Sequence, residues 1–283
     1  MKIISAPGRS AITETRDPNW VPDEVDINKP SVARIYDYFL GGGHSFAVDR
    51  EFAEKALLVH PHAPEMARLN RAFLRRAVVF MVHRGIRQFL DLGSGIPTVG
   101  NVHEIAQSRA RASRVVYVDK EDVAVAHTRL MLEHNWRATM VHSDATRVDD
   151  VLNAPETRQL LDFDRPIGLL ALTLFHYVPD DPFAVAERYR DALAPGSCLA
   201  ISHLCSDLMS DAENDRLVGL VGKTRDSLYP RGSADVARLF GDFDLVAPGL
   251  VTASRWRPDP GSGHSEVLEG DRLLVGVARK PVD

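Results

Sequence analysis

The stretch DLGSGIPTVGN, residues 91–101, decides the fold, and it follows the strand-like segment IRQFL, residues 86–90. A short strand that runs into closely spaced glycines and then a helix is typical of an open α/β sheet, where ligands bind at the carboxyl ends of the strands. Glycines let the backbone approach a ligand because they have no Cβ atom. The turn formed by Gly93, Ser94 and Gly95 is therefore predicted to bind a ligand.

Asp91 stands at the end of this strand, just before the glycine turn. In a dinucleotide-binding protein the pyrophosphate lies on such a turn, and a carboxylate beside it would repel the phosphates. S-adenosylmethionine has no phosphate but carries a sulfonium and an α-ammonium group, and a carboxylate attracts both. Pro97 also occupies the place of the third glycine of the dinucleotide motif. These two residues favour S-adenosylmethionine as the cofactor.

Two further acids end the next two predicted strands. The stretch VVYVDK ends in Asp119 and Lys120, and VHSDAT contains Asp144 and Ala145. Asp119 would accept hydrogen bonds from both ribose hydroxyls. Asp144 would accept a hydrogen bond from the adenine amino group, and the Ala145 N–H would donate to a ring nitrogen of adenine. A single acid at a strand end is more often a helix cap or part of a solvated turn. Acids at three successive strand ends favour a cofactor site over coincidence.

The chain after residue 84 alternates short apolar runs with helical segments, which indicates a parallel sheet covered on both faces. The last two strand-like segments, FDLVAPGLV and DRLLVGVARK, are joined by a stretch with prolines and glycines that suits a hairpin. The last strand is therefore predicted to be antiparallel. The predicted strands are 87–92, 114–118, 138–142, 167–174 and 197–203, and the helices between them are 99–109, 121–134, 147–161 and 182–193.

Residues 1–84 are predicted to be an N-terminal extension and helical cap, and residues 85–283 the α/β domain. Tyr36 is a candidate for a lid over the cofactor, or else packs its helix to the core. Arg71 is a candidate partner of the cofactor's carboxylate, or else forms a surface salt bridge. The cap helices are expected at 32–40, 48–58 and 64–84. The predicted cofactor-binding residues are Tyr36, Arg71, Asp91, Gly93, Ser94, Gly95, Asp119, Lys120, Asp144 and Ala145.

At this point the chain resembles a known family, the bacterial S-adenosyl methyltransferases, first described as a domain of unknown function. The resemblance rests on the strings SVARIYDYFLGG, NRAFLRRAV, QFLDLGSGIPTVGNVHE, VVYVD, FHYVPDD and PGLV, and it covers nearly the whole chain. It implies the class I, Rossmann-like methyltransferase fold with a seven-stranded, mostly parallel sheet. It also implies S-adenosylmethionine as cofactor, but no particular substrate.

His176, in LTLFHYVPDD, is the best-placed candidate for a catalytic base because its strand ends beside the expected methyl group. The alternative is that it packs under the cofactor or bonds a backbone carbonyl. His203, Tyr229 and Arg231 are further candidates for the acceptor pocket, with ordinary structural roles as the alternative. The histidines of the HPH stretch at 60–62 have no third ligand nearby, so no metal site is predicted.

The composition of the chain limits its partners. With 283 residues and a net charge of −5, it has no general attraction for nucleic acids or anionic membranes. Its two cysteines and its lack of a long apolar segment predict a soluble, cytoplasmic protein without disulfides. We expect a methyltransferase that acts on an O, N or C atom of a small molecule. The alternatives are a nicotinamide-dependent oxidoreductase and a non-catalytic sensor of S-adenosylmethionine; the oligomeric state is left open.

Overall fold

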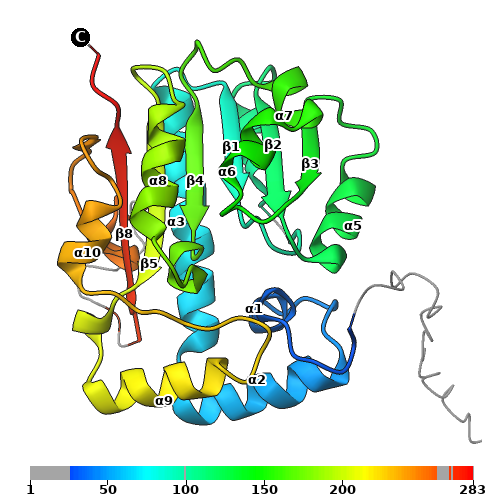
Figure 1. Ribbon diagram of the computed structural model, residues 1–283, viewed down its shortest axis with the longest axis vertical. Helices are drawn as coiled ribbons and strands as arrows, with labels where there is room; N and C mark the ends of the chain where they lie inside the picture. The colour runs from blue at the N-terminus through cyan, green and yellow to red at the C-terminus, as the bar shows by residue number, and fades with distance from the viewer. Residues whose placement is uncertain (1–25, 99, 260–267, 269, 283) are drawn as a thin grey trace, which may run out of the picture.

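A computed structural model of the chain describes residues 26–98, 100–259, 268 and 270–282. One sheet forms the centre, with helices against both faces and a smaller helical layer below the carboxyl ends of the parallel strands (Figure 1). The strands run in the order β3-β2-β1-β4-β5-β8-β6, and β7 also pairs with β8. Their bounds are β1 Gln88–Leu92, β2 Arg114–Asp119, β3 Ala138–His142, β4 Gly168–Leu172, β5 Cys198–Leu204, β6 Asp244–Leu245, β7 Val251–Thr252 and β8 Leu273–Arg279.

The pairing confirms the predicted parallel sheet with an antiparallel last strand. The strands β1 to β5 pair in parallel, and β8 runs antiparallel to β5 along its whole length. Both β6 and β7 pair with β8, so they share its other edge and together fill the seventh position of the sheet. Pro248 lies between them and has no N–H to continue the ladder, which divides this edge strand in two.

The predicted helices occur, with one error. The expected helix 147–161 is broken, because Pro155 forces the preceding Ala154 into an extended conformation with ψ 136°. The helix expected from residue 99 begins later, where Asn101 and Glu104 form a capping box. The helices are α1 Val32–Phe39, α2 Ala47–Val59, α3 Ala63–His83, α4 Val102–Arg109, α5 Asp122–Met131, α6 Val148–Asn153, α7 Pro155–Leu160, α8 Pro182–Asp191, α9 Asp211–Val221 and α10 Ser233–Arg238, with short 3₁₀ turns η2 Phe175–Tyr177, η3 Ser206–Leu208 and η4 Ala253–Arg255.

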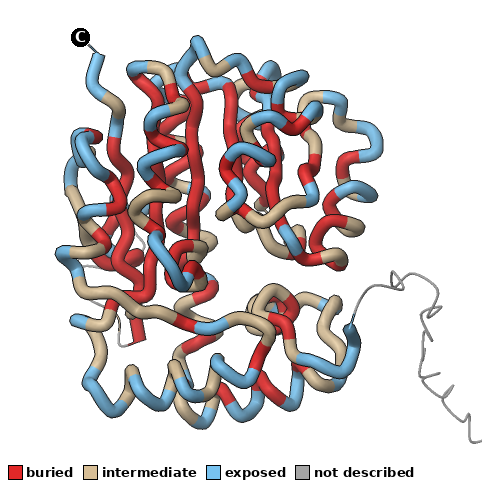
Figure 2. The backbone as a smooth tube through the Cα atoms, in the orientation of Figure 1, coloured by how far each residue is buried: buried red, intermediate tan, exposed pale blue. Residues whose placement is uncertain are grey.

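The central strands are buried because they lie between two apolar layers. In β1, β4 and β5 every residue is buried (Figure 2). Phe89 of β1 packs in one apolar cluster with Phe73 of α3, whereas its neighbour Leu90 packs in the other with Tyr189 of α8. Alternate residues of the strand thus point to opposite layers, as the pleat requires.

The helices α1, α2 and α9 form the layer below the strand ends (Figure 1). The sequence did not predict α9, which comes from the segment between β5 and α10 and packs against α2. In contrast, α3 packs along the sheet, against β4, β5 and β8. The domain boundary after residue 84 stays a prediction, and by packing α3 belongs with the sheet. No helix in the described part of the chain is long and apolar enough to span a membrane.

Candidate active site

A cavity of about 870 Å³ lies between the carboxyl ends of the parallel strands and the helices α1, α2 and α9. All the cofactor-binding residues predicted from the sequence line it, and so do His176 and Tyr229. His203 and Arg231 lie outside its lining. The fold thus brings strand-end residues and residues of the N-terminal helices into one chamber.

The glycine turn after β1 has the conformation that its sequence predicts. Gly93 and Gly95 have φ of 66° and 67°, in the left-handed region that favours glycine. A Cβ atom on Gly93 would also lie 2.9 Å from the Leu174 side chain. The N–H groups of Gly93 and Ser94 donate to the carbonyl oxygen of Val118 at 2.8 and 3.1 Å. These bonds hold the turn against the end of β2.

Asp91 is a buried carboxyl group at the floor of the cavity, 5% exposed. Burial raises the pKa of Asp91 to about 7, although the Arg71 guanidinium opposes this rise and Asp119 adds to it. None of the described residues donates a hydrogen bond to the Asp91 carboxylate. Since a buried negative charge needs a partner, this group can attract a cation that enters the cavity.

Asp119 and Asp144 already accept hydrogen bonds from their own loops. Asp119 Oδ2 accepts from the N–H of Gly95 at 2.7 Å, and its Oδ1 accepts from the N–H of Glu121 at 2.9 Å. Asp144 Oδ1 accepts from both the N–H and the hydroxyl of Thr146 at 2.8 and 2.7 Å. Its Oδ2 accepts no hydrogen bond from the described residues. Both acids therefore shape their loops and keep further acceptor capacity for a ligand.

The pKa values of these two acids move in opposite directions. Burial raises the pKa of Asp119 above its ordinary value, and the backbone N–H groups around it only reduce that rise. Burial also acts to raise the pKa of Asp144, but the bonds from Thr146 and the charge of Lys120 outweigh it and lower the pKa. Asp144 is thus an anion at neutral pH.

Charged pairs join the end of β2 to the layer below it. Lys120 Nζ donates to Asp226 Oδ1 at 2.8 Å. Glu121 Oε1 lies 3.7 Å from Arg225 Nη1, and its Oε2 lies 4.0 Å from Nη1 of Arg34 on α1. Because residues 225 and 226 follow α9, these pairs tie both the N-terminal helices and the α9 segment to the floor of the cavity.

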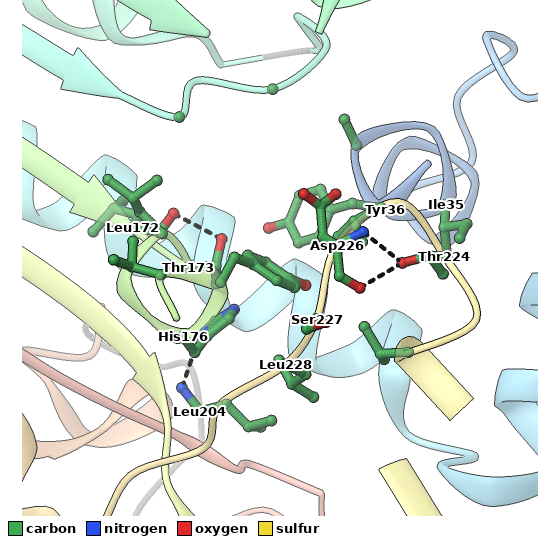
Figure 3. A pocket seen from close by; sticks show the side chains of 18 of the residues that line it. Ile35, Tyr36, Leu172, Thr173, His176, Leu204, Thr224, Asp226, Ser227 and Leu228 are labelled. Carbon is green, nitrogen blue, oxygen red and sulfur yellow. Dashed lines mark hydrogen bonds between the residues drawn. The ribbon is translucent and has the colours of Figure 1, made fainter. Parts of the chain in front are cut away.

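A chain of hydrogen bonds that sequence reasoning missed runs from α1 to the end of β4. Asn70 Nδ2 donates to the Tyr36 hydroxyl at 3.0 Å, and the Ser202 hydroxyl donates to Asn70 Oδ1 at 2.7 Å. The N–H of Thr173 then donates to the Ser202 hydroxyl oxygen at 2.9 Å. Thr173 has a φ of 52°, a strained conformation for a β-branched residue. Figure 3 shows Tyr36 and Thr173 at the cavity wall.

His176 lines the cavity, but its contacts are those of a structural residue. Its Nδ1 accepts from the N–H of Leu204 at 3.1 Å (Figure 3), and its carbonyl oxygen accepts from the N–H of Tyr229 at 2.7 Å. Burial, with smaller effects of His203 and Arg231, lowers the pKa of His176 well below its ordinary value. A neutral ring that accepts at Nδ1 carries its proton on Nε2. This geometry leaves His176 a donor and does not support the predicted role as a base.

His203 and Arg231 hold the loop around His176 in place. Nη1 of Arg231 donates to the carbonyl oxygen of Phe175 at 2.7 Å and lies 3.2 Å from Nε2 of His203. Its Nη2 donates to the carbonyl oxygen of Val178 at 3.0 Å. These contacts match the structural alternative for both residues.

Part of the cavity is an apolar lobe. The described charged residues that line the cavity lie at the ends of β1 to β4, on α3 and in the segment after α9. The apolar lobe carries no such charge, and its wall comes from α2, α9, β5 and β8. We define it by Phe52, Ala56, His60, Leu204, Leu217 and Leu273.

The sheet order, the antiparallel last strand and the acids around the glycine turn define a class I, Rossmann-like methyltransferase. A family model described as S-adenosyl methyltransferase matches residues 18–281, and the chain belongs to this family. It is therefore an enzyme that uses S-adenosylmethionine as its cofactor. The family decides the choice between S-adenosylmethionine and a nicotinamide cofactor that the sequence left open.

Solved structures support the same assignment. A crystal structure from Thermobifida fusca YX, assigned as a methyltransferase, is 36% identical with a TM-score of 0.86 and covers 94% of this chain and 98% of that chain. A DUF574 family protein from Streptomyces avermitilis MA-4680 is 34% identical with a TM-score of 0.86, over 90% of this chain and 100% of that chain. A search of curated proteins finds no match. The comparisons confirm the predicted family, fold class and cofactor.

Proposed function

We propose that the enzyme methylates an O, N or C atom of a small molecule that binds in the apolar lobe. The supporting observation is that one continuous cavity joins the glycine turn and the three strand-end acids to this lobe. When bound, S-adenosylmethionine would supply a methyl group to an electron pair of the acceptor, and S-adenosylhomocysteine would be the leaving group. The helices α1, α2 and α9 limit the access of water to this chamber.

The cavity offers complementary groups for each part of the cofactor. In this proposal Asp91 pairs with the α-ammonium group and Arg71 with the carboxylate of the methionine part. Asp119 accepts hydrogen bonds from the ribose hydroxyls, and Asp144 and Ala145 contact the adenine. The carboxylate of Asp91, which is buried and accepts no hydrogen bond from the described residues, supports the first pairing most directly, since an ammonium group would neutralise it.

The remaining predicted residues shape the chamber around these contacts. Gly93 and Gly95, with Ser94 between them, let the backbone approach the cofactor. The hydrogen bonds from Thr146 lower the pKa of Asp144, and the charge of Lys120, which Asp226 holds, adds to this effect. Tyr36 belongs to the wall that faces the methyl group.

The same proposal extends to partners and location. We propose a small-molecule acceptor rather than a nucleic acid, because the net charge is −5 and the apolar lobe carries no charged wall. Cys198 and Cys205 are free and buried, which supports a reducing compartment and hence the cytoplasm.

Incubation with methyl-labelled S-adenosylmethionine and fractionated metabolite extracts tests this function. We expect label in a small molecule and release of S-adenosylhomocysteine, with both lost in the Asp119→Ala variant. Tight binding of S-adenosylhomocysteine with no label transferred to any fraction would instead favour the non-catalytic sensor.

A further inference from the structure

The apolar lobe contains a buried polar atom to which no described residue forms a hydrogen bond. His60, which follows the last residue of α2, is 3% exposed and lines the cavity. Its Nε2 is buried and has no hydrogen-bond partner among the residues that the structure describes. Buried polar atoms in proteins are nearly always paired, so an exception at a binding cavity points to a missing ligand group.

Glu213 of α9 determines which kind of ligand group His60 can receive. Glu213 Oε1 lies 3.8 Å from Nδ1 of His60 and accepts a hydrogen bond from Nε of Arg272 at 3.2 Å. A carboxylate beside Nδ1 favours the ring proton on that nitrogen and leaves Nε2 as an acceptor. Burial lowers the pKa of His60 although Glu213 opposes this, so the ring is neutral at neutral pH. His60 therefore fits an O–H or N–H donor.

The sheet order places His60 at a distance from the cofactor's end of the cavity. Arg272 directly precedes β8, whose first residue, Leu273, lines the apolar lobe. In the sheet, β4 and β5 lie between β8 and β1, where the glycine turn begins. Three strand spacings amount to about 14 Å. His60 can therefore contact the part of an acceptor that is remote from the reacting atom.

We propose that His60 is a specificity-determining residue for an uncharged, largely apolar acceptor whose O–H or N–H group donates to Nε2. This inference rests on the proposed function, because it takes the apolar lobe as the acceptor site. An ionised acceptor would lose its hydration there without finding a charged partner in the wall. An apolar acceptor with one donor would bury its surface and satisfy Nε2 at the same time.

Three matched probes test the inference in the presence of saturating S-adenosylhomocysteine, which prevents turnover. Indole is neutral with one N–H donor, N-methylindole lacks the donor, and indole carboxylate is an anion. We expect the wild-type enzyme to bind indole about threefold to tenfold more tightly than N-methylindole in a calorimetric titration. Indole carboxylate should bind most weakly of the three probes. Equal affinity for indole and N-methylindole, tighter binding of the carboxylate, or no binding of indole would overturn the inference.

Variants assign the preference to His60. In His60→Phe the preference for indole should disappear, while His60→Gln, which keeps an acceptor oxygen, should retain part of it. His62→Gln is the matched control, since that histidine is over one-third exposed and lies outside the cavity lining. The affinity for S-adenosylhomocysteine reports whether each variant is folded. A wild-type enzyme that does not bind S-adenosylhomocysteine would contradict the proposed function rather than this inference. A preference that survives in folded His60→Phe would overturn the inference. Should that variant not fold, a preference in His60→Gln as large as that of the wild type would overturn it.

Discussion

The backbone N–H of Gly95 donates to Oδ2 of Asp119 at 2.7 Å, so the carboxylate that ends β2 also fixes the glycine turn that follows β1. Its other oxygen, Oδ1, accepts from the N–H of Glu121. A carboxylate offers about four acceptor sites, which leaves capacity on both oxygens for the ribose hydroxyls. One side chain thus shapes the loop and contacts the ligand.

This dual role predicts a large effect of Asp119→Ala on cofactor binding. The variant loses the ribose contacts and the bond that holds Gly95. Since a hydrogen bond to a charged group contributes about 1.5–3 kcal/mol, affinity for S-adenosylhomocysteine should fall at least about tenfold. Calorimetric titration measures it, with Asp119→Asn as the control that keeps an oxygen for Gly95 and should bind with intermediate affinity. Unchanged affinity in the alanine variant would contradict the assigned role.

Asp91 should make cofactor affinity depend on pH. Burial raises its pKa from 3.8 to about 7 in the unliganded protein, with Arg71 opposing and Asp119 adding to the rise. Because the pKa of Asp91 is higher in the folded than in the unfolded protein, the unliganded protein loses stability as pH rises from 3.8 to about 7. An ammonium group favours the charged carboxylate, so cofactor affinity should increase through the same window. As pH falls below about 7, affinity should therefore decrease by up to about tenfold per pH unit.

Titrations with S-adenosylhomocysteine on both sides of neutral pH check this dependence. Asp91→Asn removes the titrating group and should give weaker, nearly pH-independent binding. Asp149→Asn, a surface variant outside the cavity lining, should keep the wild-type profile. A wild-type profile as flat as that of Asp91→Asn would refute the pairing of Asp91 with the cofactor's ammonium group.

Much of the cofactor end of the site could be predicted because it depends on local pattern and sheet topology. Parallel strands place their carboxyl ends at one edge of a sheet, so Asp91, Asp119 and Asp144 could be brought together from strand positions alone. The positive φ of Gly93 and Gly95 likewise follows from residue type at a tight turn.

The acceptor end depends on contacts that sequence spacing does not show. Ser202 and Asn70 bond across 132 positions of the chain, and only the fold reveals that pairing. The helix α9 has no fully buried residue, and its apolar side chains Leu217, Leu220 and Val221 lie only in its second half. This pattern is too short to indicate a helix by itself, yet α9 supplies Glu213. The HPH pattern suggests only a metal ligand at His60, because Glu213, its neighbour on α9, is distant in the sequence.

His176 should not titrate near neutral pH. Its Nδ1 accepts from Leu204, and burial together with His203 and Arg231 lowers its pKa well below the ordinary value. Nitrogen-detected NMR of histidine side chains should therefore show a neutral ring, protonated on Nε2, between about pH 5 and pH 8. His176→Gln identifies the resonance. A midpoint near the ordinary value of 6.5, or a proton on Nδ1, would restore the base role predicted from the sequence.

Glu121 should control how long the cofactor remains bound. Its carboxylate faces Arg225 at 3.7 Å and Arg34 at 4.0 Å, so it joins both parts of the helical layer to the end of β2. Burial raises the pKa of Glu121, but both arginines oppose this and favour its charged form. In Glu121→Gln the two arginines lose that charge, and the layer should open more often.

We expect S-adenosylhomocysteine to dissociate about threefold to tenfold faster from Glu121→Gln in stopped-flow measurements, with unfolding free energy lower by about 1–3 kcal/mol. The control is Asp149→Asn, which breaks the exposed pair with Arg188 and should change unfolding free energy by less than about 1 kcal/mol. A dissociation rate that matches this control would show that the helical layer does not depend on Glu121 for its closure.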